Sequence, residues 1–423
     1  MMNQNVGSLP KPLVYVSFLM KPASFLSHEE AYELVLKWIQ NNPAGIKPLL
    51  KQPGHISVKE TELTRHLKSI QIISPESGLD DVNFFTDCSL SIHPYRLLPN
   101  TEYVNLNGTE QEEGQTAAIR CCNLPNPIFE GLWKSLIFEE DLKARLLSYV
   151  KAVAEFGERG VDDYLVGLNR LVLLHGPPGT GKTSLARALA QSVSIVLGSR
   201  FDQFQLLELN CHGLYSRWFS ESSKAVVRAF DQLQELARQP RTFLMLLVDE
   251  VESVAMDRGS SLGGHEPTDG IRVVNALLTQ LDKLRAFPNV IVVATSNMTK
   301  AIDAAVVDRA DICMFVGTPS QTAIKMILHG ALSELILKRV IELPHQTEPL
   351  TLDYIHSLLD SDFKAPFEKA VHYCQGISGR QLRKLPFITY ASCTCQYGSV
   401  TLPIFLDSLV KAAYDQSVQR SSS

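Results

Sequence analysis

The sequence of 423 residues has no hydrophobic run long enough to cross a membrane. Its longest apolar runs, such as Phe243–Val248, fall far short of the roughly 20 residues that a spanning helix requires. The polar start of the chain also has no apolar core of signal-peptide length. We therefore expect no membrane association and a location in the nucleus and cytoplasm.

The chain also lacks paired C-x-x-C motifs and an excess of positive charge. The eight cysteines include Cys393-Thr-Cys395 but no pair of C-x-x-C motifs, which argues for free thiols rather than a zinc site or a disulfide framework. Forty Lys and Arg against 45 Asp and Glu give a net charge of −5, which disfavours direct binding of nucleic acid. What the chain does have is 45% hydrophobic residues, and its length suits about three domains.

Residues 1–98 have the pattern of a small α+β domain. Leu13–Met20 is rich in β-branched and aromatic residues and predicts a strand. Ser27 and Glu30 form a capping box, so we expect an amphipathic helix from there to about residue 41. A second helix is predicted around Glu60–Ile70, followed by short strands. No catalytic motif is visible in this domain.

The rest of the chain divides into three segments. Residues 99–122 are turn-prone and acidic, which predicts a linker that lets the first domain move. In residues 123–319, short apolar runs alternate with helical stretches, as in a doubly wound α/β domain with a parallel sheet. Residues 320–423 have helical spacing and predict a helical domain. The predicted strands are Leu171–Leu174, Leu206–Leu209, Phe243–Val248 and Val290–Ala294.

A phosphate-binding loop follows the first of those strands. The segment fits G-x-x-x-x-G-K-[ST] and leads into a helical stretch, so its backbone N–H groups and the helix amino end would face phosphate oxygens. Lys182 would bind the β- and γ-phosphates of ATP, and the Thr183 hydroxyl would bind Mg²⁺. The predicted nucleotide-binding residues are Gly176, Pro177, Pro178, Gly179, Thr180, Gly181, Lys182, Thr183 and Ser184.

Two adjacent carboxylates, Asp249 and Glu250, end the strand Phe243–Val248. Ligands of such sheets bind at the carboxyl ends of the strands, and neighbouring strand residues point in opposite directions. The two carboxylates can therefore act differently. Asp249 is predicted to complete the Mg²⁺ site with Thr183, and Glu250 to act as the general base toward the attacking water.

Together with Thr295-Ser296-Asn297 after the next strand, these motifs resemble those of the AAA+ P-loop ATPases, which have a large α/β domain and a helical lid. The resemblance implies that Asn297 orients the attacking water and that Arg309 is the arginine finger for a neighbouring subunit. Many relatives carry a second arginine three residues later, where this chain has Ile312. Arg380, in Ser378-Gly-Arg380, resembles the lid arginine that contacts nucleotide. The predicted catalytic residues are thus Glu250, Lys182, Asn297, Arg309 and Arg380.

Two further segments gain an expected role from this resemblance. Trp218 and Phe219 follow the second strand in polar surroundings and resemble a pore loop that grips a threaded polypeptide. The alternative is that the two rings pack as a staple at a helix start. Residues 129–138 are expected to lie at the adenine, with no individual contact assigned.

Several longer strings resemble more narrowly the pachytene checkpoint protein 2 family, also called thyroid receptor-interacting protein 13. Relatives in this family are ATP-driven homohexamers that remodel HORMA-domain proteins with a HORMA-like adaptor. They act in control of the meiotic chromosome axis and in the spindle assembly checkpoint, at chromosomes and kinetochores. The resemblance implies that residues 1–98 bind adaptor and substrate. The strings are GLWKSLIF (131–138), LLHGPPGTGKTSLARALAQ (173–191), RWFSES (217–222), DEVESV (249–254), IRVVNALLTQLDKL (271–284), VDRADI (307–312) and SGRQLRKLPF (378–387).

Two other functions fit parts of the sequence. A nucleic-acid-directed motor, such as a clamp loader, would share the ATPase motifs, but the acidic balance and the absence of a basic stripe disfavour it. A nucleotide-gated scaffold would need no turnover, whereas Lys182, Glu250, Asn297 and Arg309 together predict hydrolysis.

Overall fold

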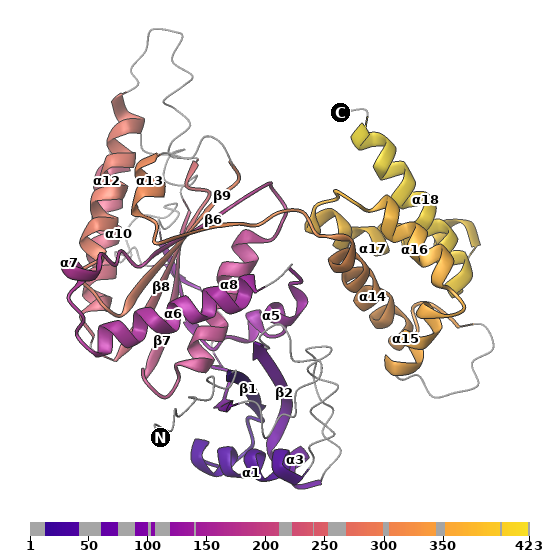
Figure 1. Ribbon diagram of the computed structural model, residues 1–423, viewed down its shortest axis with the longest axis horizontal. Helices are drawn as coiled ribbons and strands as arrows, with labels where there is room; N and C mark the ends of the chain where they lie inside the picture. The colour runs from indigo at the N-terminus through magenta and orange to yellow at the C-terminus, as the bar shows by residue number, and fades with distance from the viewer. Residues whose placement is uncertain are drawn as a thin grey trace, which may run out of the picture.

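The computed structural model shows three packed bodies (Figure 1). An α+β body at the amino end lies beneath a larger α/β body, and a helical body lies to one side of the larger one. The structure describes residues 13–41, 61–74, 89–99, 103–105, 119–138, 141–210, 222–239, 241–252, 268–298, 304–343, 352–397 and 400–421.

The first body is built on a sheet of order β2-β1-β3. Strand β1 pairs antiparallel with β2 and parallel with β3. The predicted capping box is present: Ser27 N–H donates to Glu30 Oε2 at 2.8 Å, and Glu30 N–H donates to Ser27 Oγ at 3.1 Å. One face of the sheet packs on α1 through a separate apolar cluster. The elements are β1 (Leu13–Met20), α1 (His28–Asn41), α3 (Thr61–His66), β2 (Leu67–Ser74) and β3 (Ser89–Tyr95).

The second body has a sheet of order β10-β6-β9-β8-β7-β5-β4, in which β10 through β7 are parallel and β5 and β4 are antiparallel to their neighbours. The strands are β4 (Val104–Asn105), β5 (Ile119–Leu124), β6 (Leu171–His175), β7 (Gln203–Asn210), β8 (Thr242–Asp249), β9 (Val290–Ser296) and β10 (Ile312–Phe315). The helices are η1 (Pro127–Phe129), α5 (Leu132–Ser135), α6 (Leu142–Glu158), α7 (Asp163–Val166), α8 (Lys182–Val196), α10 (Ser222–Ala237), α12 (Thr268–Leu284) and α13 (Ala304–Arg309).

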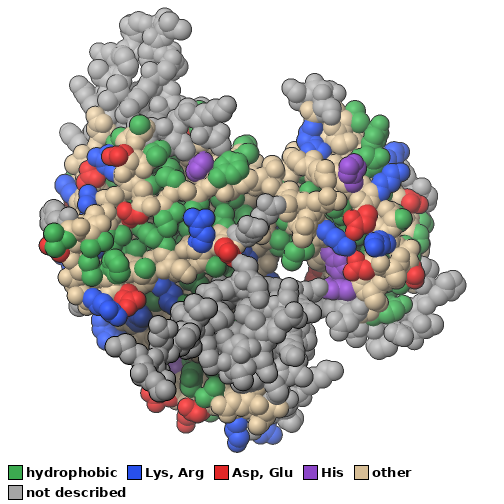
Figure 2. Space-filling view, viewed as in Figure 1, with side chains coloured by type: hydrophobic (Ala, Val, Ile, Leu, Met, Phe, Trp, Pro, Cys, Tyr) green, Lys and Arg blue, Asp and Glu red, His purple; other side chains and the backbone are tan. Residues whose placement is uncertain are grey.

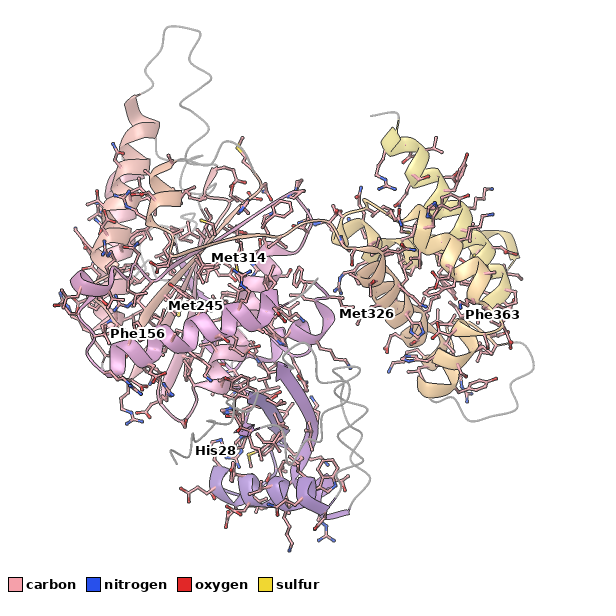
Figure 3. All side chains as sticks on the ribbon, viewed as in Figure 1. His28, Phe156, Met245, Met314, Met326 and Phe363 are labelled. Carbon is pink, nitrogen blue, oxygen red and sulfur yellow. The ribbon has the colours of Figure 1, made fainter. Side chains whose placement is uncertain are left out.

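Helices cover both faces of this sheet because its central strands are apolar on both sides. Alternate strand residues, such as Met245 and Met314, pack with α6 and α8. The residues between them, such as Leu244 and Leu246, pack with α10 and α12. Figure 3 shows Met245 and Met314 inside this body and Met326 on the separate helical body. The predicted doubly wound α/β domain is therefore confirmed.

The third body consists of helices around its own apolar core. Ser320 caps the first helix by accepting the N–H of Ala323 at 3.2 Å. The helices are α14 (Gln321–Leu337), α15 (Leu352–Asp360), α16 (Lys364–Tyr373), α17 (Gly379–Tyr397) and α18 (Leu402–Ser421). Among the described residues, no helix is both long enough and apolar enough to cross a membrane.

The first body is docked against the second. The sheet face that points away from α1 contributes Tyr15, Leu19, Ile73 and Tyr95 to the same apolar cluster as α6 and α8. At this junction, the indole N–H of Trp133 donates to the Ile73 carbonyl at 2.6 Å. Burial of these side chains fixes the orientation of the two bodies in this structure.

Two sequence predictions need correction. The helix predicted around Glu60–Ile70 ends at His66, and the chain continues as β2, whose residues Leu67 and Ile70 are buried in the first body. The predicted linker 99–122 contains β4 and the start of β5, which pair with each other and, through β5, with β7. Residues 119–122 therefore belong to the sheet, because Ile119, Cys121 and Cys122 are buried there.

The turn between α13 and β10 is held by Asp311. Its carboxylate accepts the N–H of Asn169 at 3.0 Å, the N–H of Arg170 at 2.6 Å and the Tyr149 hydroxyl at 2.7 Å. Because Arg170 is almost fully buried, few water molecules can replace the carboxylate as acceptor.

We predict that Asp311→Ala destabilises the protein by about 3 kcal/mol, since buried N–H donors would lose their acceptor. The free energy of unfolding would be measured by urea titration. Asp308→Ala, at an exposed site in the same segment, is the matched control and should change little. Equal unfolding midpoints for the two variants would contradict the structural role assigned to Asp311.

Candidate functional site

The loop between β6 and α8 is closely surrounded by backbone and by the helical body. Gly176 has φ of 148°, and a Cβ atom there would lie 2.2 Å from the Val316 carbonyl oxygen. Gly179 has φ of 77°, and a Cβ there would lie 3.0 Å from Ser378 Oγ of the helical body. Both positions therefore require glycine, for conformation and for space. The remaining loop residues follow the same turn: Pro178 is exposed, Thr180 donates its hydroxyl to the Pro177 carbonyl at 3.0 Å, Gly181 is the N-cap of α8, and Ser184 lies in its first turn.

Lys182 is buried at the amino end of α8. Its ammonium group donates to the carbonyl oxygens of Gly176 and Pro177, each at 2.8 Å. Burial lowers the pKa of Lys182, and nearby carboxylates, with Glu252 first among them, oppose that shift. The lysine thus lies within its own loop, where it can exchange carbonyl partners for phosphate oxygens.

Asp249 connects the predicted metal ligand to the sheet. Its Oδ1 accepts the Thr183 hydroxyl at 2.7 Å and the Thr295 hydroxyl at 2.6 Å. A threonine hydroxyl beside a carboxylate is an all-oxygen donor set, which suits Mg²⁺. The sequence named Thr183 and Asp249 for this role, and the structure brings them into direct contact.

Glu250 and Asn297 face each other across the ends of β8 and β9. The Asn297 amide Nδ2–H donates to Glu250 Oε1 at 3.3 Å, and the Glu250 N–H donates to Thr295 Oγ1 at 3.0 Å. Glu250 has φ of 55°, which costs about 1 kcal/mol or more in a non-glycine residue. The strained backbone turns an exposed carboxylate out of the strand direction and toward the amide. A water molecule attacking a phosphate would find both groups at one place.

The helical body touches the nucleotide loop directly. The Arg380 N–H donates to the Gly179 carbonyl at 2.9 Å, and the exposed Arg380 side chain contributes to the lowered pKa of Lys182. On the opposite side, Leu136 and Phe138 lie within 3.6 Å of where a Cβ of Gly181 would stand. The segment expected at the adenine is therefore next to the loop.

Arg309 lies apart from this group. Its guanidinium forms a two-bond pair with Asp282, at 2.8 and 3.0 Å, and donates to the Ala305 carbonyl at 3.0 Å. These partners belong to α12 and α13, so the structure does not bring Arg309 to the nucleotide loop of its own chain. Trp218 and Phe219 lie outside the described residues, between β7 and α10.

Sequence reasoning missed three residues that shape the site. Thr295 was quoted only as part of a motif, yet it bonds to both Asp249 and Glu250. Glu252 is buried and accepts the Asn297 N–H at 2.9 Å. Arg383 donates to the Ser135 carbonyl from the helical body. The sequence signal for Glu252 was a third acidic residue in the string DEVESV, directly after an apolar strand.

Comparison with known families and proteins shows which proteins this chain resembles. A model described as ATPase family associated with various cellular activities (AAA) matches residues 172–318, and a model described as TRIP13-like, AAA+ ATPase lid C-terminal domain matches residues 320–417. The chain is 39% identical to the pachytene checkpoint protein 2 homolog of Arabidopsis thaliana over 402 residues, covering 92% of this chain and 85% of the relative. It is 40% identical to the Homo sapiens homolog over 375 residues, covering 85% and 84%.

Solved structures show the same similarity. The structure of C. elegans PCH-2 matches with a TM-score of 0.74 and 30% identity, covering 96% of this chain and 99% of that one. A chain from the E. coli MS115-1 HORMA:CdnC:Trip13 complex matches with a TM-score of 0.51 and 19% identity, covering 71% and 94%, which shows a shared fold.

We predict that Glu250→Gln lowers the rate of ATP hydrolysis by about 10²–10³-fold, because the amide cannot accept a proton from water. Binding of ATP should persist, since Lys182 and Thr183 are unchanged. Phosphate release and binding of a fluorescent nucleotide would be measured side by side. Glu235→Gln, at an exposed site on α10, is the control. Turnover near that of the unmodified protein in Glu250→Gln would refute the general-base assignment.

Proposed function

Because this chain belongs to the pachytene checkpoint protein 2 family of AAA ATPases, we propose that it uses ATP hydrolysis to remodel HORMA-domain proteins. The ATPase fold and its lid follow from the family. The observation that supports remodelling is the resemblance to a Trip13 chain from a complex that also contains a HORMA protein. The docking of the first body against α8 also supports the proposal, since it connects a partner-binding body to the nucleotide site.

In this proposal ATP binds as its Mg²⁺ complex. Thr183 and Asp249 would hold the ion, which would neutralise phosphate charge, and Lys182 would contact the β- and γ-phosphates. Glu250 accepts a proton from the attacking water, which Asn297 orients. Arg380 senses nucleotide from the lid, since its backbone already contacts the loop at Gly179.

We extend the proposal to a homohexamer. Arg309 bonds to Asp282 and Ala305 and not to the nucleotide loop of its own chain, so in this proposal its guanidinium would contact a nucleotide across the boundary between assembled subunits. Trp218 and Phe219 would line the central channel and grip a segment of the substrate. The first body would bind the substrate and a HORMA-like adaptor.

The cellular setting is also a proposal. We place the protein in the nucleus and cytoplasm, at chromosomes and kinetochores. There it would act in meiotic chromosome-axis control, which fits the pachytene checkpoint in the family name, and in the spindle assembly checkpoint. Nucleic acid is not the proposed substrate. Lys and Arg side chains are interspersed with Asp and Glu on the visible face, and the described residues form no continuous basic stripe there (Figure 2).

We predict that the protein converts a closed HORMA-domain protein to its open form when ATP and adaptor are present. Trp218→Ala should keep ATP hydrolysis within about threefold but lose conversion at least tenfold, because the aromatic grip is lost while the nucleotide site is intact. Conversion would be followed by ion-exchange separation of the two conformers. Trp218→Phe, which keeps an aromatic ring, is the matched control. Absence of ATP-dependent conversion by the unmodified protein would remove the proposed function, and full conversion by Trp218→Ala would remove the pore-loop role.

We predict that Arg309 acts across a subunit boundary. A guanidinium supplied in trans is worth about 10³–10⁵-fold in turnover, so Arg309→Ala alone and Lys182→Ala alone should both be nearly inactive. Mixing the two proteins should restore ATPase activity above the sum of the separate rates, because some intact nucleotide sites then face an intact arginine. Arg238→Ala, at an exposed arginine directly after α10, replaces Arg309→Ala in the control mixture. Strictly additive rates would argue that Arg309 has no role in trans.

A further inference from the structure

A third carboxylate, Glu252, lies just behind the Asp249-Glu250 pair. It follows Glu250 by two residues and is 7% exposed, whereas Glu250 is exposed to solvent. A carboxylate is rarely buried to this degree without partners that compensate for the lost hydration. The partners of Glu252 therefore indicate what the residue does.

One oxygen of Glu252 is bonded to the turn that follows β9 and begins at Asn297, which we call the sensor turn. Oε1 accepts the backbone N–H of Asn297 at 2.9 Å, in the turn that follows β9. The side-chain amide of the same Asn297 donates to Glu250 Oε1 at 3.3 Å. Asn297 is therefore held by two acids: Glu252 bonds to its backbone, and Glu250 bonds to its side chain.

The other oxygen, Oε2, is buried and has no hydrogen-bond partner among the described residues. A carboxylate with one unsatisfied buried oxygen destabilises the fold, so packing alone does not account for an acid at this position.

We propose that Glu252 is a positioning residue for ATP hydrolysis, which fixes the sensor turn through the Asn297 N–H so that the Asn297 amide stays aligned with Glu250. Its action is indirect, because its bond is to the backbone and not to the reacting groups. A hydrogen bond from a backbone N–H to a buried side-chain oxygen holds the turn at a fixed distance, and either a carboxylate or an amide oxygen can accept it. Without it, the turn after β9 would lose its anchor, and the amide would be free to rotate away from the general base.

Two substitutions separate the effect of side-chain length from the effect of charge. Glu252→Gln keeps an oxygen at the same distance from the Asn297 N–H but removes the charge. Glu252→Asp keeps the charge but draws the carboxylate back by one methylene. Because the proposal depends on the hydrogen bond, we expect kcat to fall about tenfold further in Glu252→Asp than in Glu252→Gln. The dissociation constant of a fluorescent ADP analogue should stay within about twofold in both variants, because the sensor turn positions water and does not bind the nucleotide.

A double-mutant cycle with Asn297→Ala tests whether Glu252 acts through Asn297. If Glu252 acts through Asn297, Glu252→Asp should add less than about twofold to the loss already caused by Asn297→Ala. A role in folding alone would instead lower the thermal midpoint and reduce activity equally in both backgrounds. An equal or larger loss in Glu252→Gln, or fully additive losses in the cycle, would overturn the proposal.

This inference rests on the role proposed for Asn297 in hydrolysis. If Asn297→Ala hydrolyses ATP at the unmodified rate, the positioning role is overturned as well. All of these measurements use the full chain and ATP without a protein substrate. A protein that hydrolyses ATP but fails to convert a HORMA-domain protein would therefore overturn the proposed remodelling and leave the role of Glu252 standing.

Discussion

The hydrogen bonds of the Thr295 hydroxyl hold the site together. Thr295 donates to Asp249 and accepts from the Glu250 N–H, and Asp249 also accepts the Thr183 hydroxyl. These contacts join the ends of β8 and β9 to the first turn of α8. The proposed metal ligands and the proposed general base therefore share one rigid support, which parallel strands provide because their carboxyl ends meet at the same edge. A small displacement of β9 would disturb both functions at once, since reacting groups tolerate shifts of only about 1 Å.

The helix that begins at Lys182 also carries the first body. Lys182 lies at the amino end of α8, and the later turns of α8 join the apolar cluster that contains Tyr15 and Tyr95. Residues 131–138 add a second connection. Trp133 bonds to the first body, Arg383 of the lid bonds to Ser135, and residues 136 and 138 lie beside the nucleotide loop. Short, packed segments therefore connect the nucleotide loop to both other bodies.

The sequence predicted the parts of the fold that depend on continuous burial. The four central strands contribute apolar residues to both faces of the sheet and were recognisable from their short, continuous apolar runs. Strand β5 was missed because exposed Arg120 and Asn123 interrupt its apolar pattern, and β10 because it has only four residues. In the site, motif spacing identified Lys182 and Glu250 because phosphate chemistry demands those residue types. Thr295 and Glu252 act through other residues of the site, so no motif spacing marks them, and only the folded geometry reveals their contacts.

Glu208 extends the coupling from the nucleotide helix to the strand that precedes the predicted pore loop. It is buried on β7, two residues before the end of that strand, and accepts two hydrogen bonds from Arg187 at 2.7 and 3.1 Å. Arg187 lies on α8, one turn after Thr183. Arg120 of β5 and the Tyr103 hydroxyl complete the shell around Glu208 at 3.2 and 3.0 Å. Arg187, Arg120 and Tyr103 together compensate for the burial of the Glu208 carboxylate and join α8, β5 and β7 at one point. The end of β7, from which the chain continues toward Trp218, is therefore joined by charge-assisted hydrogen bonds to the helix that begins at Lys182.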